Sequence, residues 1–111
     1  MTVTLPLTIA EIKEAEAQLA RAKKVLSEAT IIQTSCKRDL DSAKSVATIT
    51  GKNPEEREKE MRFQCHREIL SLQRAENEYH TARVAHEQAE LHWDSIRYQL
   101  RLLEVMKGVG G

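Results

Sequence analysis

A seven-residue repeat of apolar and small side chains runs through most of this 111-residue chain and constrains its fold more than any other feature. No Gly or Pro interrupts it between residues 8 and 48. Its positions are Ile12, Leu19, Leu26, Gln33, Leu40 and Ala47, and the first five are each followed three residues later by a small residue, namely Ala15, Ala22, Ala29, Cys36 and Ala43. Such heptads form the seam along which long helices pack. The pattern predicts a long first helix.

The same pattern fills the second half of the chain. Its seam positions are Cys65, Leu72, Tyr79, His86, Trp93 and Leu100, interleaved with Met61, Glu68, Ala75, Ala82, Ala89, Ile96 and Leu103. Asn53 before Pro54 is typical of a helix start, because Asn caps free N–H groups and Pro has no N–H to leave unpaired. Thr8 and Glu11 form a capping box. We therefore predict helices over about 8–48 and 54–107, joined by a turn at 49–53.

Two seams in one chain predict an antiparallel hairpin, in which the position numbers of facing residues add up to a constant. A total of 101 places large residues opposite small ones in most layers, and its midpoint falls in the expected turn. The layers would be Ile12/Ala89, Ala15/His86, Leu19/Ala82, Ala22/Tyr79, Leu26/Ala75, Ala29/Leu72, Gln33/Glu68, Cys36/Cys65 and Leu40/Met61. The predicted fold is all-α, a long antiparallel coiled-coil helical hairpin over 8–107, with an N-terminal arm at 1–7 and a flexible tail at 108–111.

A second apolar row lies off the seam of the second helix. It consists of Phe63, Leu70, Val84, Leu91, Tyr98 and Val105, with Asn77 as its polar member. A contiguous apolar stripe normally marks a partner surface, so we predict that the hairpin assembles through this row into a helical-bundle homo-oligomer. The second helix also overhangs the first at SIRYQLRLLEV, and either a second subunit or the arm TVTLPL would cover that overhang.

Composition narrows the classes of function. Seventeen basic and 17 acidic residues balance, so no global field favours nucleic acid or anionic lipid. The sequence has no apolar run long enough for a membrane span and no signal-peptide pattern at its start. We therefore expect a cytoplasmic protein, in the host cytoplasm if it is viral, with no membrane partner and with its two cysteines as thiols.

The tip segment TITGKNPEERE contains the main candidate ligand site. It lacks the spacing of a phosphate-binding loop of the Walker type, but the start of a helix beside basic side chains can hold a phosphate. The candidate binding residues are Lys44, Lys52, Arg57 and Arg62. Neighbouring glutamates oppose such a site, and the alternative that the segment is only a capped turn is the favoured one. The polar layer Gln33/Glu68 could line an internal binding site, although a structural role that fixes the register is favoured.

No catalytic or metal centre is predicted. His80, His86 and His92 are spaced by six residues, so each points about 120° away from the last on a helix and they cannot share one ion. Cys36 and Cys65, in one predicted layer, are expected to be seam thiols that could cross-link on oxidation. We expect no cofactor and no enzymatic activity.

The tip TGKNPEERE and the region AENEYHTARVAHEQAELHWDSIRYQLRLLEVM resemble small helical proteins encoded by bacteriophages and prophages. Those proteins carry a similar TGKN tip and a C-terminal helix ending in Arg-Leu-Leu. The resemblance implies a phage protein that assists DNA recombination or blocks a host defence, either by binding a defence protein or by sequestering its nucleotide messenger. It assigns no functional residue.

The functional prediction is a non-catalytic, oligomeric helical binding protein, phage-encoded and anti-defence in role, that sequesters or blocks a host-defence protein or a nucleotide ligand. The alternative is a nucleic-acid-binding accessory of phage DNA recombination or replication, which would use the basic residues near the tip. Affinity that falls steeply with salt would distinguish the second function from the first.

Overall fold

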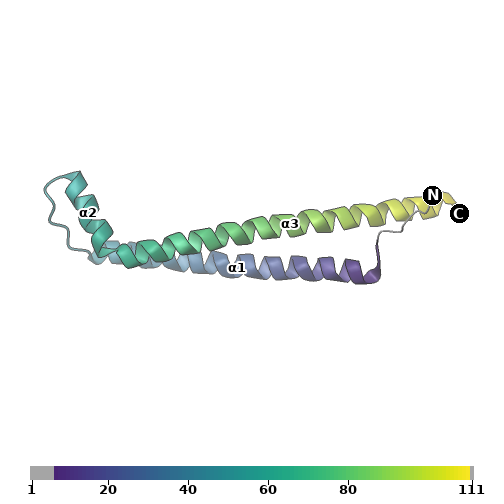
Figure 1. Ribbon diagram of the computed structural model, residues 1–111, viewed down its shortest axis with the longest axis horizontal. Helices are drawn as coiled ribbons and strands as arrows, with labels where there is room; N and C mark the ends of the chain where they lie inside the picture. The colour runs from purple at the N-terminus through teal and green to yellow at the C-terminus, as the bar shows by residue number, and fades with distance from the viewer. Residues whose placement is uncertain (1–6, 111) are drawn as a thin grey trace. The chain divides into compact units, whose positions relative to one another are not determined.

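The computed structural model describes residues 7–110, with side chains to residue 107, and the described part is all-α, with no strand. Its helices are α1 (Ile9–Val46), α2 (Pro54–Gln64) and α3 (His66–Gly110) (Figure 1). The chain divides into two compact units. Unit 1 joins α1 up to Val25 with α3 from Arg83 onward, and unit 2 comprises residues 26–82.

Both predicted helix starts are confirmed. Glu11 N–H donates to Thr8 Oγ1 at 3.1 Å, and Thr8 N–H donates back to Glu11 Oε2 at 3.4 Å, which completes the capping box at α1. Asn53 caps α2, since its Oδ1 accepts from Glu56 N–H at 2.9 Å, and Pro54 is the first helical residue.

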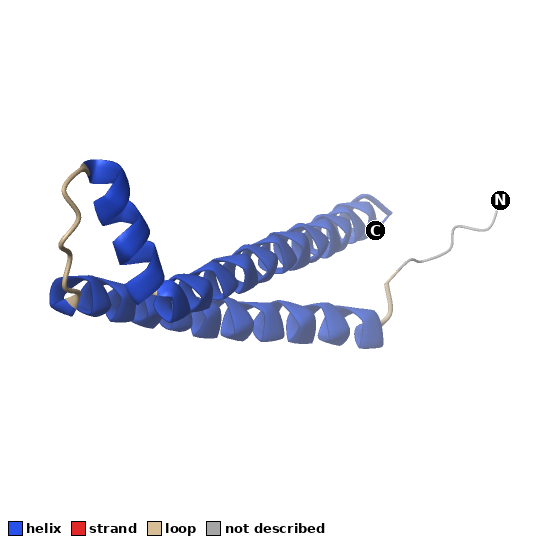
Figure 2. Ribbon diagram, turned by 60° about the vertical axis from the view of Figure 1, so that its left-hand side comes forward, coloured by secondary structure: helices blue, strands red, loops and turns tan. Residues whose placement is uncertain are grey.

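The predicted seam residues are those that lose solvent contact. In each unit α1 and α3 lie side by side and antiparallel (Figures 1 and 2). Every seam position named above is buried or half-buried. The most buried are Ala15, Ala29, Leu40, Cys65, Ala75, Ala82 and Ile96. Small residues dominate this set because they let two helix backbones approach closely.

The second helix is not continuous, which corrects the prediction of one helix over 54–107. It is divided at Cys65, whose φ of −102° and ψ of 17° leave the α-helical range. The backbone hydrogen bonds nonetheless continue across the break, from Cys65 N to Met61 O and from Ile69 N to Cys65 O, both at 2.9 Å. Within unit 2 the chain therefore bends sharply at one buried residue, and α2 turns away from α3 (Figure 2).

The register of the seam is also corrected. Cys36 lines a groove with Ser71, and Ala22 lines one with Ala85 and Ala89, whereas the predicted layers paired Cys36 with Cys65 and Ala22 with Tyr79. The Cys36 groove also includes Arg67 and Glu68, and all the α3 residues of these two grooves lie two to ten residues beyond the predicted partner, or farther. We interpret this displacement as a shift of about one heptad. The shift follows from the bend, because the connection between α1 and α3 now includes all of α2 rather than a five-residue turn.

This shift separates two pairs that were expected to face each other. Cys36 and Cys65 are both free thiols, and Cys65 Sγ instead lies 3.7 Å from Met61 Sδ of its own helix segment. Glu68 shares a groove with Cys36 and Asp39 rather than a layer with Gln33. The new register still places small residues opposite large ones, because that alternation itself repeats every seven residues.

The structure describes little of the predicted N-terminal arm but most of the backbone of the predicted C-terminal tail. Residues 1–6 of the predicted arm lie outside the described residues, and Leu7 begins the described chain half-buried. α3 continues to Gly110, past the expected end at Lys107, so helical backbone extends through part of the predicted tail.

Candidate interaction surfaces

The tip of unit 2 consists of the loop at 47–53 and α2, and we call it the finger. The loop runs antiparallel along α2 (Figure 2). Thr48 N–H donates to Gln64 Oε1 at 3.0 Å, and Gln64 Nε2 donates back to Thr48 O. Farther out, Thr50 N–H donates to Glu60 Oε2 at 2.8 Å, and Lys52 N–H to Glu56 Oε2 at 3.0 Å. Three alternate backbone amides are thus bound by three side chains of α2.

The spacing of these contacts follows from the geometry of the two backbones. Side chains four residues apart on a helix lie on one face, about 6 Å apart along its axis. Alternate amides of an extended chain point the same way and lie about 6.6 Å apart. Gln64, Glu60 and Glu56 on α2 therefore match residues 48, 50 and 52 one for one.

Gly51 is required by this packing. A Cβ placed on it would lie 2.8 Å from Arg57 N and 2.9 Å from Glu56 Cβ, both closer than real side chains approach. Arg57 Nε also donates to Gly51 O at 2.9 Å, which holds the loop against the first turn of α2. The glycine of the TGKN segment is therefore explained by close backbone contact.

The predicted phosphate residues lie in different places. Lys52 and Arg57 lie at the start of α2, and Arg57 is hydrogen-bonded to the Gly51 carbonyl. Arg62 is in the last turn of α2 and pairs with Glu58, while Lys44 is in the last turn of α1. A phosphate at the start of α2 would compete with the Glu56 carboxylate for Lys52 N–H. Phosphate binding by these four residues stays a prediction.

The predicted oligomer-interface row is exposed in the single chain. Its members have exposed fractions of 85% for Phe63, 48% for Leu70, 36% for Val84, 68% for Leu91, 64% for Tyr98 and 58% for Val105. Phe63 precedes the bend at Cys65 and belongs to α2, so it does not continue the row on α3. The exposed row on α3 accordingly begins at Leu70.

The predicted row omitted further exposed residues of this surface in unit 1, although Leu102 lies within the predicted overhang SIRYQLRLLEV. Leu102 is 45% exposed and Met106 is 64% exposed, and Leu102 lies four residues after Tyr98. That spacing is the signal that could have found it, because residues four apart share one face of a helix. Counting only every seventh residue left out the second position of the heptad.

Unit 1 also has an open groove between the start of α1 and α3, with a volume of about 440 Å³. It is lined by Leu7, Ala10, Glu11, Glu14, Ala15, His92, Ser95, Ile96 and Gln99. Gln99 Nε2 contacts Ser95 Oγ at 3.4 Å, whereas Gln99 Oε1 is buried without a hydrogen-bond partner in the described structure. An unpaired buried carbonyl is costly, so this groove contains a side-chain oxygen that is not satisfied within the described residues.

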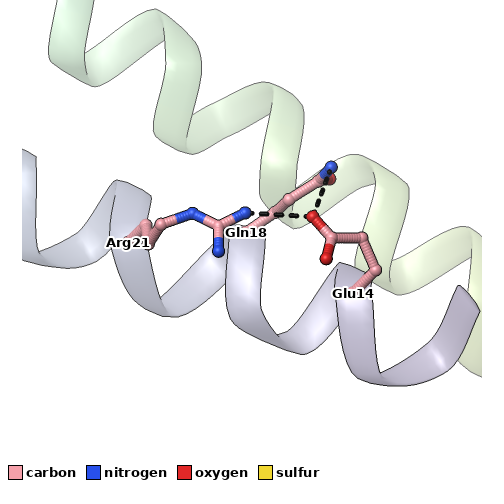
Figure 3. A network of polar contacts seen from close by, with 3 residues as sticks. All are labelled: Glu14, Gln18 and Arg21. Atoms are coloured by element: carbon pink, nitrogen blue, oxygen red, sulfur yellow. Dashed lines mark hydrogen bonds and ion pairs between the residues drawn. The ribbon is translucent and has the colours of Figure 1, made fainter. Parts of the chain in front are cut away.

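A polar network borders the same groove on α1. Glu14 Oε1 accepts from Arg21 Nη2 at 3.0 Å and from Gln18 Nε2 at 3.4 Å (Figure 3). The Glu14 and Arg21 side chains are 60% and 63% exposed, so this pair contributes little to stability. It fixes the direction of three side chains along one edge of α1.

A groove in unit 2 is more polar than the groove at the start of α1 in unit 1. It is lined by Cys36, Asp39, Ser42, Arg67, Glu68 and Ser71. It contains a thiol and two hydroxyls but no histidine.

The described residues lack two features that particular classes of protein require. They contain no group of three or more His, Cys, Asp or Glu side chains arranged to hold a metal ion. Within them, no helix combines the length and the apolar character that crossing a bilayer requires. Comparison with protein-family models, with curated protein sequences and with solved structures finds no match to this chain.

Proposed function

We propose that this chain is a non-catalytic helical binding protein that self-associates and acts by occupying a partner. The observation that carries the proposal is the row of large apolar side chains on α3 that the hairpin leaves in water, from Leu70 to Val105. A single exposed leucine is ordinary, but a periodic row on one helix face is typical of a protein interface.

The helix packing within each unit supports binding rather than chemistry. In each unit the helices pack through a narrow seam of small residues, and the grooves described above are open to solvent, whereas a reaction that must exclude water needs an enclosed site. Within each unit, two antiparallel helices instead present long exposed faces, which suit contact with another protein or another copy of the chain.

The resemblance to small phage proteins supplies the partner class for this proposal. A host-defence protein would meet an apolar helix face, whereas a nucleotide messenger would need the basic residues of the finger. The exposed apolar row favours the protein partner, because backbone N–H groups at the start of α2 are already bound within the chain. Lys52 N–H donates to the Glu56 carboxylate, and Glu56 N–H donates to the Asn53 amide oxygen.

Native mass spectrometry of the protein, purified without denaturation from the host in which it is expressed, tests the proposal. We expect a defined oligomer. Extra mass matching a nucleotide or oligonucleotide would shift the function to sequestration of that ligand or to nucleic-acid binding. A monomer at about 100 µM protein would contradict self-association.

A nucleic-acid role makes a separate prediction. Affinity that depends on phosphate contacts falls steeply as salt rises. If DNA binding is detected and charge reversal at Arg57 and Lys52 abolishes it, the accessory role replaces the one proposed here.

A further inference from the structure

The exposed apolar residues of α3 in unit 1 have the sequence pattern of one helix in a symmetric antiparallel pair. Leu91, Tyr98 and Val105 recur every seven residues, and Leu102 lies four after Tyr98. At about 100° per residue they share one face of α3, which we call the outer face. The seam residues Trp93 and Ile96 lie on nearly the opposite side, so α1 and a second partner can bind α3 at once.

Written as heptads, the outer face has two alternating positions. One is Val84, Leu91, Tyr98 and Val105, and the other is Gln88, Ser95 and Leu102. In an antiparallel pair each residue of the first kind packs opposite one of the second kind. In a parallel pair each residue packs opposite its own equivalent.

Volume matching favours the antiparallel arrangement. Pairing Leu91 with Leu102 of a second copy brings Tyr98 opposite Ser95, a large side chain against a small one, on both sides of the two-fold axis. A parallel pair would instead stack Tyr98 on Tyr98 and leave Ser95 facing Ser95, with a gap between them. Close packing disfavours such an uneven interface.

Charge gives an independent reason for the same register. Asp94 and Arg101 flank the outer face on one side and are exposed. With Leu91 opposite Leu102, Asp94 of one copy lies beside Arg101 of the other, and the two-fold axis repeats the pair. Among the described residues, Asp94 pairs with Arg97 at the long distance of 3.9 Å, which a closer cationic partner could replace.

We infer that two copies of this chain pair through the outer faces of α3, antiparallel, with Leu91 against Leu102 and Asp94 against Arg101. In this register Arg83 of one copy faces Gly110 of the other, so the contact uses the α3 segment of unit 1 alone. The inference rests on the self-association included in the proposed function, and it specifies the surface, the direction and the register.

Charge reversal with rescue tests the inference in the full-length protein. Asp94→Arg and Arg101→Asp each create two like-charge contacts across the axis, and we expect each to raise the dimer dissociation constant about fivefold at low salt. The double variant D94R/R101D restores both pairs in swapped order. We expect its dissociation constant to return to within about twofold of the unaltered protein.

Sedimentation equilibrium provides the measurement, with circular dichroism to verify that each variant keeps its helix content. Glu78→Arg is the matched control, because it makes the same charge change on an exposed residue of α3 outside the paired segment. We expect the control to leave the dissociation constant unchanged. An oligomer in which both single variants behave like the control would overturn the inference and leave the proposed function standing.

Cross-linking tests the direction of the pair. With Cys36 and Cys65 replaced by Ala, copies carrying Asp94→Cys are mixed with copies carrying Arg101→Cys and oxidised. We expect the mixed disulfide to form faster than either disulfide between identical copies. Preferential linkage of identical copies would show another arrangement, and an unaltered protein that is monomeric at about 100 µM would remove both the pairing and the proposed self-association.

Discussion

Glu60 accepts the Thr50 backbone N–H at 2.8 Å, and this contact holds the extended loop against α2. Glu60 is only partly exposed and sits midway between Glu56 and Gln64, which bind the neighbouring alternate amides. We predict that Glu60→Ala raises the hydrogen-exchange rate of the Thr50 amide about five- to tenfold, because a charge-assisted hydrogen bond is lost. Exchange at seam positions should not change.

Glu58→Ala is the control for that variant. Glu58 lies on the same helix but pairs with Arg62 rather than with the loop. If Thr50 exchanges equally fast in both variants, the loop is not held by Glu60 and the finger is less ordered than the structure shows.

Gly51→Ala should loosen the whole finger. The added methyl group would meet the Arg57 backbone nitrogen at 2.8 Å, and backbone cannot move aside as a flexible side chain can. We predict faster trypsin cleavage after Lys52, with a change of less than about 1 kcal/mol in the free energy of unfolding of the remaining helices. Glu55→Ala, at an exposed site two residues into α2, should cleave at the original rate.

The register of unit 2 can be tested with cysteines. Cys36 and Ser71 line the same groove. Cys65 precedes Ser71 by six residues, which corresponds to about 9 Å at the helical rise of about 1.5 Å per residue. We predict that Ser71→Cys with Cys65→Ala forms an intramolecular disulfide with Cys36 under mild oxidation. The unaltered pair Cys36 and Cys65 should stay reduced under the same conditions.

Gln73→Cys with Cys65→Ala controls for collisional oxidation, because position 73 is exposed on another face of α3. Non-reducing electrophoresis at low protein concentration separates the products. Rapid closure of Cys36 to Cys65 in the unaltered protein would restore the register expected from the sequence.

The seam should not tolerate larger side chains. Ala82 is 4% exposed and is a seam residue in the α3 part of unit 2. We predict that Ala82→Leu lowers the free energy of unfolding by about 1–3 kcal/mol, because the added atoms force the helices apart. Urea denaturation followed by circular dichroism measures the change.

Ala20→Leu is the matched control, since the same atoms are added to an exposed position of α1. Its effect should stay within about 0.5 kcal/mol. An equal loss in both variants would mean that the leucine acts through something other than packing in the seam.

Local chemistry in the sequence was enough to locate three features. Thr8 with Glu11, and Asn53 with Pro54, mark helix starts that depend on atoms within four residues of each other. The faces of α1 and α3 that meet were also predictable, because a heptad of apolar and small residues places them on one side of each helix. The exposed row from Leu70 to Val105 followed from the same periodicity.

The bend at Cys65 was not predictable from local signals. No Pro or Gly marks it, and its neighbours Gln64 and Arg67 favour helix, while Cys65 and His66 are weaker helix formers that long helices still tolerate. It occurs together with contacts between residues 16 apart, such as Thr48 with Gln64, which fold α2 back along its own loop. Helix propensity contains no information about such a contact.

The sequence by itself therefore determined which faces pack, and only the tertiary structure decided how far one helix slides along the other. A pattern that repeats every seven residues is nearly unchanged by a shift of seven, so Cys36 finds a partner of suitable size in either register. The length of chain between α1 and α3 breaks that degeneracy. Once α2 folds against residues 48–52, the connection is long enough that Cys36 faces the neighbourhood of Ser71 instead of Cys65.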